Sequence, residues 1–482
     1  MLYGLNFAYL LTLHGLFTLL AVLFYVITAH VLQQRRHPTA AIAWVLFIVL
    51  VPYLAFPAFL TFGSRKQARP RIDPLRRPPQ RTGECAWTVK TAVALGQPSP
   101  APYRDQNVHV DGTQSMHALW QTIEGATHSI DVCTFILDPG PFGRAVSRRL
   151  ADKAASGVKV RLLLDGLGRL MGGRPDLSAL KAAGVKVCLF VPPLHSPLKG
   201  RTNLRNHRKM LIADAAHDTR RLWCGGRNLA PEYFEGAPGK SPWHDLSFDL
   251  GGALVKQAAN LFEHDWTFAR GRKRALVDAY VDAEVNADVG TSAEQKQRPD
   301  AMPASASAQL IASGPDQVDD TVYSLLITAA YRAQRRILLV TPYFVPDAVL
   351  LTALCLAARR GVVVDLMLPK RSNHWLSDIA RHRALRTLAA AGGRIWLAPG
   401  MLHAKLAIID DVLALAGSAN IDSRSLFLNY ELMIAFHAAP AIDEFSAWYE
   451  REQAGAIRCT PGKPGFMGDL VDGLVLWVGF QL

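Results

Sequence analysis

The chain has 482 residues, of which 50% are hydrophobic and 19% are charged, against about 25% charged residues in ordinary soluble domains. This composition excludes a disordered or low-complexity protein. The formal net charge is +13, and residues 1–81 alone carry nine Lys or Arg residues and one acid. A nucleic-acid enzyme spreads its basic residues over a binding face, so this distribution argues against a nucleic-acid partner.

Two apolar stretches open the chain. Residues 1–34 and 38–64 contain no Asp, Glu, Lys or Arg, and each exceeds the roughly 20 residues that a helix needs to cross a bilayer. A signal peptide is disfavoured, because no positive residue precedes the first stretch and its apolar part is longer than about 7–15 residues. Pro52 and Pro57 are expected to kink the second helix. Two membrane-spanning helices are predicted at about residues 5–32 and 40–62, within an N-terminal segment that covers residues 1–64.

A basic, Pro-rich collar, residues 65–81, follows the apolar stretches and opens a predicted linker that runs to residue 100. The positive-inside rule places such a collar at the cytoplasmic face. A helical hairpin then predicts a multi-pass membrane protein with a cytoplasmic catalytic region. Arg35 and Arg36, in the turn of the hairpin, argue for the opposite orientation.

The rest of the chain repeats one α/β pattern at matching positions about 200 residues apart, which indicates an internal duplication. Strand, helix and strand are expected at Ser129–Ile136, Arg144–Ala155 and Gly157–Gly166, and again at Arg336–Val345, Ala348–Arg359 and Gly361–Pro369. A further strand follows in each half, at Gly184–Val191 and Gly393–Pro399. The prediction is an α/β fold of two duplicated units, residues 101–270 and 309–482, joined by a flexible linker at 271–308 that lacks periodicity.

Each half contains one H-x-K-x4-D motif followed by a G-[GS]-x-N turn. The motif residues are His207, Lys209 and Asp214 in the first half and His403, Lys405 and Asp410 in the second. Residues two apart on a strand share a face, so each His and Lys can meet the same phosphate. Two such motifs at corresponding places of a repeat indicate function rather than chance.

These side chains suit phosphodiester chemistry in one shared active site. One His can attack phosphorus while the other protonates the leaving oxygen, and the lysines can neutralise the developing charge. The two motif aspartates are assigned to the catalytic set, with a structural role as the alternative. The turns supply hydrogen-bond donors for phosphate, and one carboxylate in each half can set the protonation of the histidines. These supporting residues are Asn228, Ser418 and Asn420, and Asp245 and Glu431.

The sequence gives no sign of a metal or another cofactor. Six cysteines are scattered without a C-x-x-C pair, which disfavours a zinc cluster or a dense disulfide framework and indicates a reducing compartment. The histidines outside the motifs also lack metal-ligand spacing with Cys or acidic residues. Neither a metal nor a cofactor is therefore expected.

At these motifs the chain resembles the phospholipase D superfamily, and within it the membrane-anchored bacterial cardiolipin synthases. The resemblance covers nearly the whole chain and rests on NLRNHRK, GGRNL, TPYFVPD, GMLHAK and GSANIDSRSLFLNYEL. It implies an inner-membrane phosphatidyltransferase that makes cardiolipin and glycerol from two phosphatidylglycerol molecules through a phosphatidyl-histidine, without a metal. A hydrolytic phospholipase D or another headgroup-exchange transferase shares every catalytic residue and stays as the alternative.

The resemblance also implies a role for each site residue. His207 and His403 act as nucleophile and general acid/base, with His207 favoured as the nucleophile. Lys209 and Lys405 bind phosphate. Two carboxylates, Asp245 and Glu431, orient the histidines.

Overall fold

The computed structural model describes residues 2–31, 38–62, 86–192, 203–236, 239–271, 306–317 and 319–462, together with residues 465 and 472. The predicted basic collar and nearly all of the predicted linker at 271–308 lie outside the described residues.

The N-terminal apolar stretches form three helices, α1 (Leu2–Val31), α2 (Pro38–Leu50) and α3 (Pro52–Phe62). The second predicted helix is therefore divided at Val51, because Pro52 has no N–H for the helical ladder and begins a new helix. Pro57, by contrast, lies inside α3. Within the described part of the chain no helix is long and apolar enough to cross a membrane, so the predicted pair of spanning helices is not confirmed.

Each half of the remaining chain builds a seven-stranded arrangement. The strands of the first half are β1 (Ala101–Val108), β2 (Ser129–Thr134), β3 (Lys159–Asp165), β4 (Lys186–Phe190), β6 (Met210–Ala213), β7 (Arg221–Gly225) and β8 (Ser247–Gly252). Those of the second half are β9 (Ser307–Ser313), β10 (Arg336–Val340), β12 (Val363–Pro369), β13 (Arg394–Ala398), β14 (Leu406–Ile409), β15 (Leu413–Gly417) and β17 (Asn429–Phe436).

The strand orders of the two halves match. They run β4-β3-β2-β6-β7-β8-β1 and β13-β12-β10-β14-β15-β17-β9, and β18 (Ile457–Cys459) extends the second beside β13. The outer three strands of each half are parallel, because helices connect them. The predicted duplication of an α/β unit is thereby confirmed. The strand expected at Arg336–Val345 ends at Val340, and its last residues form β11 (Phe344–Val345), which pairs with β16 (Ile421–Asp422).

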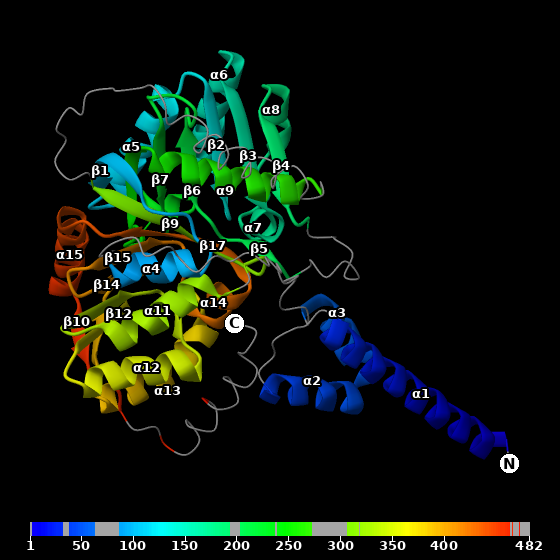
Figure 1. The fold of residues 1–482 in the computed structure, drawn as a ribbon. Coiled ribbons are helices and arrows are strands. Elements are labelled where there is room, and N and C mark those ends of the chain that lie inside the picture. The colour runs from blue at the N-terminus through cyan, green and yellow to red at the C-terminus, as the bar shows by residue number, and fades with distance from the viewer. Residues whose placement is uncertain are drawn as a thin grey trace, which may run out of the picture.

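Helices cover the outer face of each sheet (Figure 1). They are α5 (Gly112–Gly125), α6 (Pro141–Ala155) and α8 (Leu177–Ala182) on the first half, and α11 (Thr321–Arg332), α12 (Ala348–Arg359) and α13 (Trp375–Ala390) on the second. Residues 87–94, inside the predicted linker at 65–100, form α4 (Trp87–Ala94), which packs on α11. The side chain of Gln97 then accepts a hydrogen bond from the amide of Ala312 over 2.8 Å. This segment therefore belongs to the outer layer of the second half.

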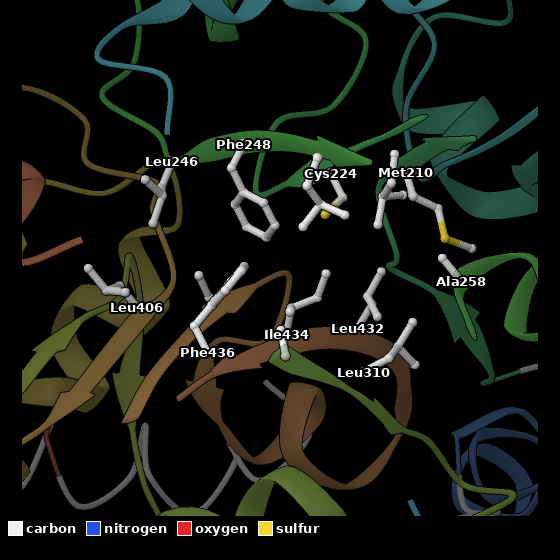
Figure 2. Close-up of a cluster of buried hydrophobic side chains, with 14 of the residues drawn as sticks. Met210, Cys224, Leu246, Phe248, Ala258, Leu310, Leu406, Leu432, Ile434 and Phe436 are labelled. Atoms are coloured by element: carbon white, nitrogen blue, oxygen red, sulfur yellow. The ribbon is translucent and has the colours of Figure 1, made fainter. Parts of the chain in front are cut away.

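β1 and β9 pair along a short stretch and join the sheets of the two halves into one. The main hydrophobic core lies between these two halves of the sheet. Figure 2 shows Met210 and Phe248 of the first half facing Leu432, Ile434 and Phe436 of the second. Two further helices, α9 (Leu254–Ala269) and α15 (Ala439–Ala454), bury their apolar faces in the same core. Strands that are covered on both faces need apolar side chains on both, which explains the continuous apolar runs that made them recognisable in the sequence.

Candidate active site

The segment that carries the first motif reaches across to the second half. Residues Arg205–Asn206 form β5, which pairs in parallel with Asn429–Tyr430 at the start of β17. The amide of His207 donates to the carbonyl of Tyr430 over 2.9 Å. His207 therefore lies beside Glu431, with its Nδ1 2.9 Å from Oε1 and 3.1 Å from Oε2 of that carboxylate.

The second motif reaches into the first half in the same way. Leu402 forms a parallel bridge with His244, and the amide of His403 donates to the carbonyl of His244 over 2.6 Å. His403 then lies beside Asp245, with 2.7 Å between its Nδ1 and Oδ2 of the carboxylate. Each histidine thus meets a carboxylate from the opposite half, and one site forms where the halves join.

Both carboxylates are buried and are held by further donors. Glu431 accepts from Ser418 Oγ over 2.5 Å and from Asn429 Nδ2 over 3.3 Å, while Asp245 accepts from the amide of Leu246 over 2.7 Å. An ionised carboxylate only accepts hydrogen bonds, so the Nδ1 of each histidine carries the proton. The opposite ring nitrogen, Nε2, is left with the free electron pair that nucleophilic attack or proton exchange requires.

A buried lysine accompanies each histidine. Lys209 Nζ donates to the carbonyl of His207 over 2.6 Å. Lys405 Nζ donates to the carbonyl of His403 and lies against its ring, 2.7 Å from Nδ1 and 3.0 Å from Nε2. Burial lowers the pKa of Lys209 to about 7 and the pKa of Lys405 to about 8. A bound anion opposes this shift and favours the charged lysines.

The histidines are neutral at pH 7. Burial lowers the pKa of His207 to about 4, with Glu431 acting against the shift. Burial and then the charge of Lys405 lower the pKa of His403 to about 3. Burial acts to raise the pKa of Asp245, but His403 and Lys405 outweigh it and bring that pKa down to about 2. Because an arriving phosphate adds negative charge, it favours one additional proton on a histidine.

The motif aspartates serve the scaffold. Asp214 accepts from three successive amides that lead into β2, and Asp410 does the same for three amides that lead into β10. Both have a positive φ, 49° and 48°, which Asp tolerates better than most residues. Five residues of extended chain, about 16 Å, separate each aspartate from its lysine. The geometry therefore supports the structural alternative, and the assignment to the catalytic set is not supported.

We expect Asp214→Asn to lower stability and to leave the chemistry intact. Burial acts to raise the pKa of Asp214, but the amides of Ser129, Thr127 and His128 outweigh it and lower that pKa to about 2. Such a carboxylate stabilises the fold by about 2–3 kcal/mol above its unfolded pKa near 3.9, and this contribution is lost as the pH falls from about 4 to about 2. Thermal unfolding of the purified protein should show the deficit at pH 7 and a smaller one at pH 3. Lost turnover in a variant of unchanged stability would restore the catalytic assignment.

The donors of the two G-[GS]-x-N turns are engaged within the protein. Asn228 Nδ2 donates to the hydroxyl of Tyr233 over 2.8 Å, and Ser418 donates to Glu431. Asn420 forms a hydrogen bond with Asp422. This bond acts to lower the pKa of Asp422, but burial outweighs it and raises that pKa to about 6. These contacts fix the walls of the site, and the contact of the three side chains with phosphate stays a prediction.

In the turn of the first half, the backbone of Gly226 packs directly against the carboxylate of Asp245. A Cβ on Gly226 would lie 2.1 Å from Asp245 Oδ1. Gly226→Ala should therefore push Asp245 away from His403. A displacement of about 1 Å in a catalytic site costs on the order of 100-fold in rate, so we expect a loss of that size with an unchanged fold by circular dichroism. The matched control is Gly125→Ala, where the new Cβ meets nothing within 4 Å. Equal turnover of the two variants would contradict this account.

Two neighbours of the histidines were missed from the sequence. Arg208, between His207 and Lys209, points to the opposite side of the strand and forms a fully buried ion pair with Asp265 of α9. The ring of Tyr233 lies 5.1 Å from that of His403, centroid to centroid. Alternation along extended chain places Arg208 on the side opposite His207 and Lys209, but nothing in the sequence links it to an acid in another element.

The chain is similar to characterised families over most of its length. A family model described as "Cardiolipin synthase, PLD-like domain" matches residues 119–266 and 326–452, and one described as "Phospholipase D-nuclease N-terminal" matches residues 19–64. Cardiolipin synthase A of Klebsiella pneumoniae subsp. pneumoniae is 30% identical over 437 residues, 86% of each chain. Cardiolipin synthase A of Pseudomonas putida (strain W619) is 29% identical over 453 residues, 89% of this chain and 88% of that one.

Among solved structures, phosphatidylserine synthase from Haemophilus influenzae superposes with a TM-score of 0.59 at 12% identity, over 82% of this chain and 100% of that chain. At this identity the likeness shows the fold. The two stretches that match the family model contain both histidine motifs and both carboxylates that contact the histidines. This confirms the resemblance seen in the sequence: the chain belongs to the phospholipase D-like cardiolipin synthase family of phosphatidyltransferases.

Proposed function

We propose that this protein joins two phosphatidylglycerol molecules into cardiolipin and glycerol. The observation that carries the proposal is the crossed pairing of His207 with Glu431 and of His403 with Asp245. This arrangement holds two imidazoles of fixed tautomer on one phosphodiester, with a lysine beside each. The relatives whose alignments cover 86% and 89% of this chain are named cardiolipin synthase A, which supports the choice of substrate.

In the first step, His207 Nε2 forms a bond to phosphorus as the bond to the glycerol oxygen breaks. His403, protonated in the complex, gives its proton to the leaving glycerol. Lys209 and Lys405 hold the other phosphate oxygens while charge develops there. We assign the attack to His207 because its side chain is 14% exposed, against 5% for His403.

In the second step, a phosphatidylglycerol hydroxyl resolves the phosphatidyl-histidine. His403, now neutral, accepts the proton of that hydroxyl, whose oxygen attacks phosphorus as the bond to His207 breaks. Cardiolipin leaves, His403 is again protonated for the next donor, and no proton is gained or lost overall. Water in place of the lipid hydroxyl would give phosphatidic acid, the product of the hydrolytic alternative.

Lipid product analysis tests this function. The full chain in phosphatidylglycerol vesicles should release one glycerol for each cardiolipin formed, because the bond that breaks is the bond to glycerol. Phosphatidic acid without cardiolipin would identify a hydrolase. A product that contains an added alcohol other than phosphatidylglycerol would identify a headgroup exchanger.

The N-terminal region supplies the membrane attachment in this proposal. Residues 19–64 match an N-terminal family model, and both apolar stretches lack charge. We propose a multi-pass anchor in the bacterial inner membrane, with the catalytic region in the cytoplasm. A single cysteine placed within residues 271–308 of a Cys-depleted variant should resist an impermeant thiol reagent in intact cells. Labelling there would reverse the orientation.

A further inference from the structure

Large apolar side chains are exposed at equivalent places in the two halves. Leu170 and Met171, at the end of α7 (Gly166–Met171), are 42% and 59% exposed, and Trp375, at the start of α13, is 68% exposed. α7 follows β3, and the segment that leads to Trp375 follows β12, the matching strand. Single exposed apolar residues are ordinary, but their recurrence at corresponding positions calls for a common explanation.

The segment of the first half adjoins the active site. Asp165, the last residue of β3, accepts hydrogen bonds from the amides of Leu167 and Gly168 at the start of α7. Its second carboxylate oxygen accepts from the amide of Asn206 over 2.9 Å. Asn206 directly precedes His207, so α7 is tied to the strand that carries one histidine.

The segment of the second half adjoins the other side of the site. Asn373, two residues before Trp375, accepts a hydrogen bond from the hydroxyl of Tyr343 over 2.6 Å. Burial raises the pKa of Tyr343, and the charges of Asp422 and Asp245 add to the shift. Tyr343 also directly precedes β11, which pairs with β16 (Ile421–Asp422), so this segment lies beside the turn of the second half that carries Ser418 and Asn420. The exposed apolar side chains of the two halves therefore belong to segments that adjoin the site from either side.

Basic side chains accompany both exposed apolar groups. Arg174 is exposed beyond α7, and Lys370 and Arg371 are exposed before Trp375. The nearby acids are already engaged: Asp176 caps α8 through the amide of Ser178 over 2.9 Å, and Asp378 pairs with Arg381 over 3.0 Å. Apolar side chains bordered by exposed cations match an anionic lipid surface, where the rings and methyl groups enter the acyl boundary and the cations meet headgroups.

We propose that Leu170, Met171 and Trp375 form a membrane-insertion rim that seats the mouth of the active site on an anionic bilayer. The inference rests on the proposed function, since it assumes a substrate drawn from that bilayer. The N-terminal region would keep the protein at the membrane, whereas the rim would set the orientation of the catalytic body. A phosphodiester then enters the site from the headgroup layer without leaving the membrane.

Turnover of two physical forms of one substrate tests the rim. With phosphatidylglycerol in vesicles, Met171→Asp and Trp375→Asp should each lower turnover roughly 10- to 100-fold, since each removes one apolar insertion. With a short-chain phosphatidylglycerol below its micellar concentration, both variants should match the wild type, because no surface is involved. Equal losses with both substrates would mean a damaged site and would overturn the proposal, as would unchanged turnover in vesicles. A wild type that makes no cardiolipin from either form would instead reject the proposed function.

A position-specific probe gives a second measurement. A fluorophore on Trp375→Cys in a Cys-depleted variant should be quenched by lipids that carry a nitroxide on the acyl chain. The labelled protein is studied in vesicles that contain phosphatidylglycerol and no other protein. The matched control is Tyr331→Cys. Tyr331 is 53% exposed at the end of α11, beside the start of β10, where Asp410 and not the histidines is the neighbouring motif residue. Quenching at both positions or at neither would reject the rim. The latter outcome would point to a protein partner for this surface.

Discussion

His207→Ala and His403→Ala should each abolish cardiolipin synthesis. The crossed contacts with Glu431 and Asp245 place both imidazoles in one site, so neither half can act alone. Loss of the acid/base costs roughly 10²–10⁴-fold, and loss of the nucleophile removes the covalent route itself. Turnover of phosphatidylglycerol in vesicles measures both. His117→Ala, an exposed histidine of α5, is the matched control and should keep wild-type turnover.

The two histidine variants should differ in one respect. With an activated donor, whose leaving group needs no proton, His403→Ala should still form a labelled phosphatidyl-protein, because its nucleophile is intact. His207→Ala should form none. Label that maps to His403 would keep the single shared site and reverse the assignment of the nucleophile. Near wild-type turnover of either variant would reject the shared site.

The sequence predicted those parts of the site that are local or repeated. His207 and Lys209 are two residues apart on extended chain, and the same spacing recurs at His403 and Lys405, so their place in one shared site could be inferred. The duplication was visible because strands covered on both faces are apolar throughout. The residue range of α12 was predicted in full, because an amphipathic helix between two apolar strands has clear ends.

The sequence could not show which side chains serve the scaffold. The amides that bind Asp214 lie 85 to 87 residues earlier in the chain, and no spacing rule connects them. Ser418 and Asn228 are good hydrogen-bond donors in any setting. Only the fold shows that Glu431 accepts the hydrogen bond of Ser418 and that Tyr233 accepts that of Asn228. Helix α4 is short, and its place follows from contacts with α11 on the other side of the linker. In each case the deciding partner is distant in sequence.

Glu431→Gln and Asp245→Asn should each reduce turnover by roughly 10²–10⁴-fold while the protein stays folded. In another enzyme family, replacing the carboxylate that holds a catalytic histidine by its amide has a cost near the upper end of this range, because the ring takes the wrong tautomer. Here an amide can donate to Nδ1, and the proton then moves to Nε2, where the electron pair is needed. Arg208 Nε still donates to the carbonyl of Glu431 over 3.0 Å, so the backbone at this point should hold.

The two amide variants should respond in opposite ways to an activated donor, and this is the sharper test. Asp245 raises the pKa of His403 through its charge and its hydrogen bond, so its loss lowers that pKa and leaves less of His403 in the protonated form that acts as the general acid. A leaving group that needs no proton should then restore adduct formation in Asp245→Asn. Glu431 holds the nucleophile instead, so the same donor should leave Glu431→Gln slow. Single-turnover adduct formation from pH 5 to pH 8 measures both. The deficit of Asp245→Asn with phosphatidylglycerol should grow with pH, because a histidine of lower pKa loses its proton at a lower pH. Equal restoration of both variants would mean that the carboxylates only hold the fold, and restoration of Glu431→Gln alone would exchange the roles of the two histidines.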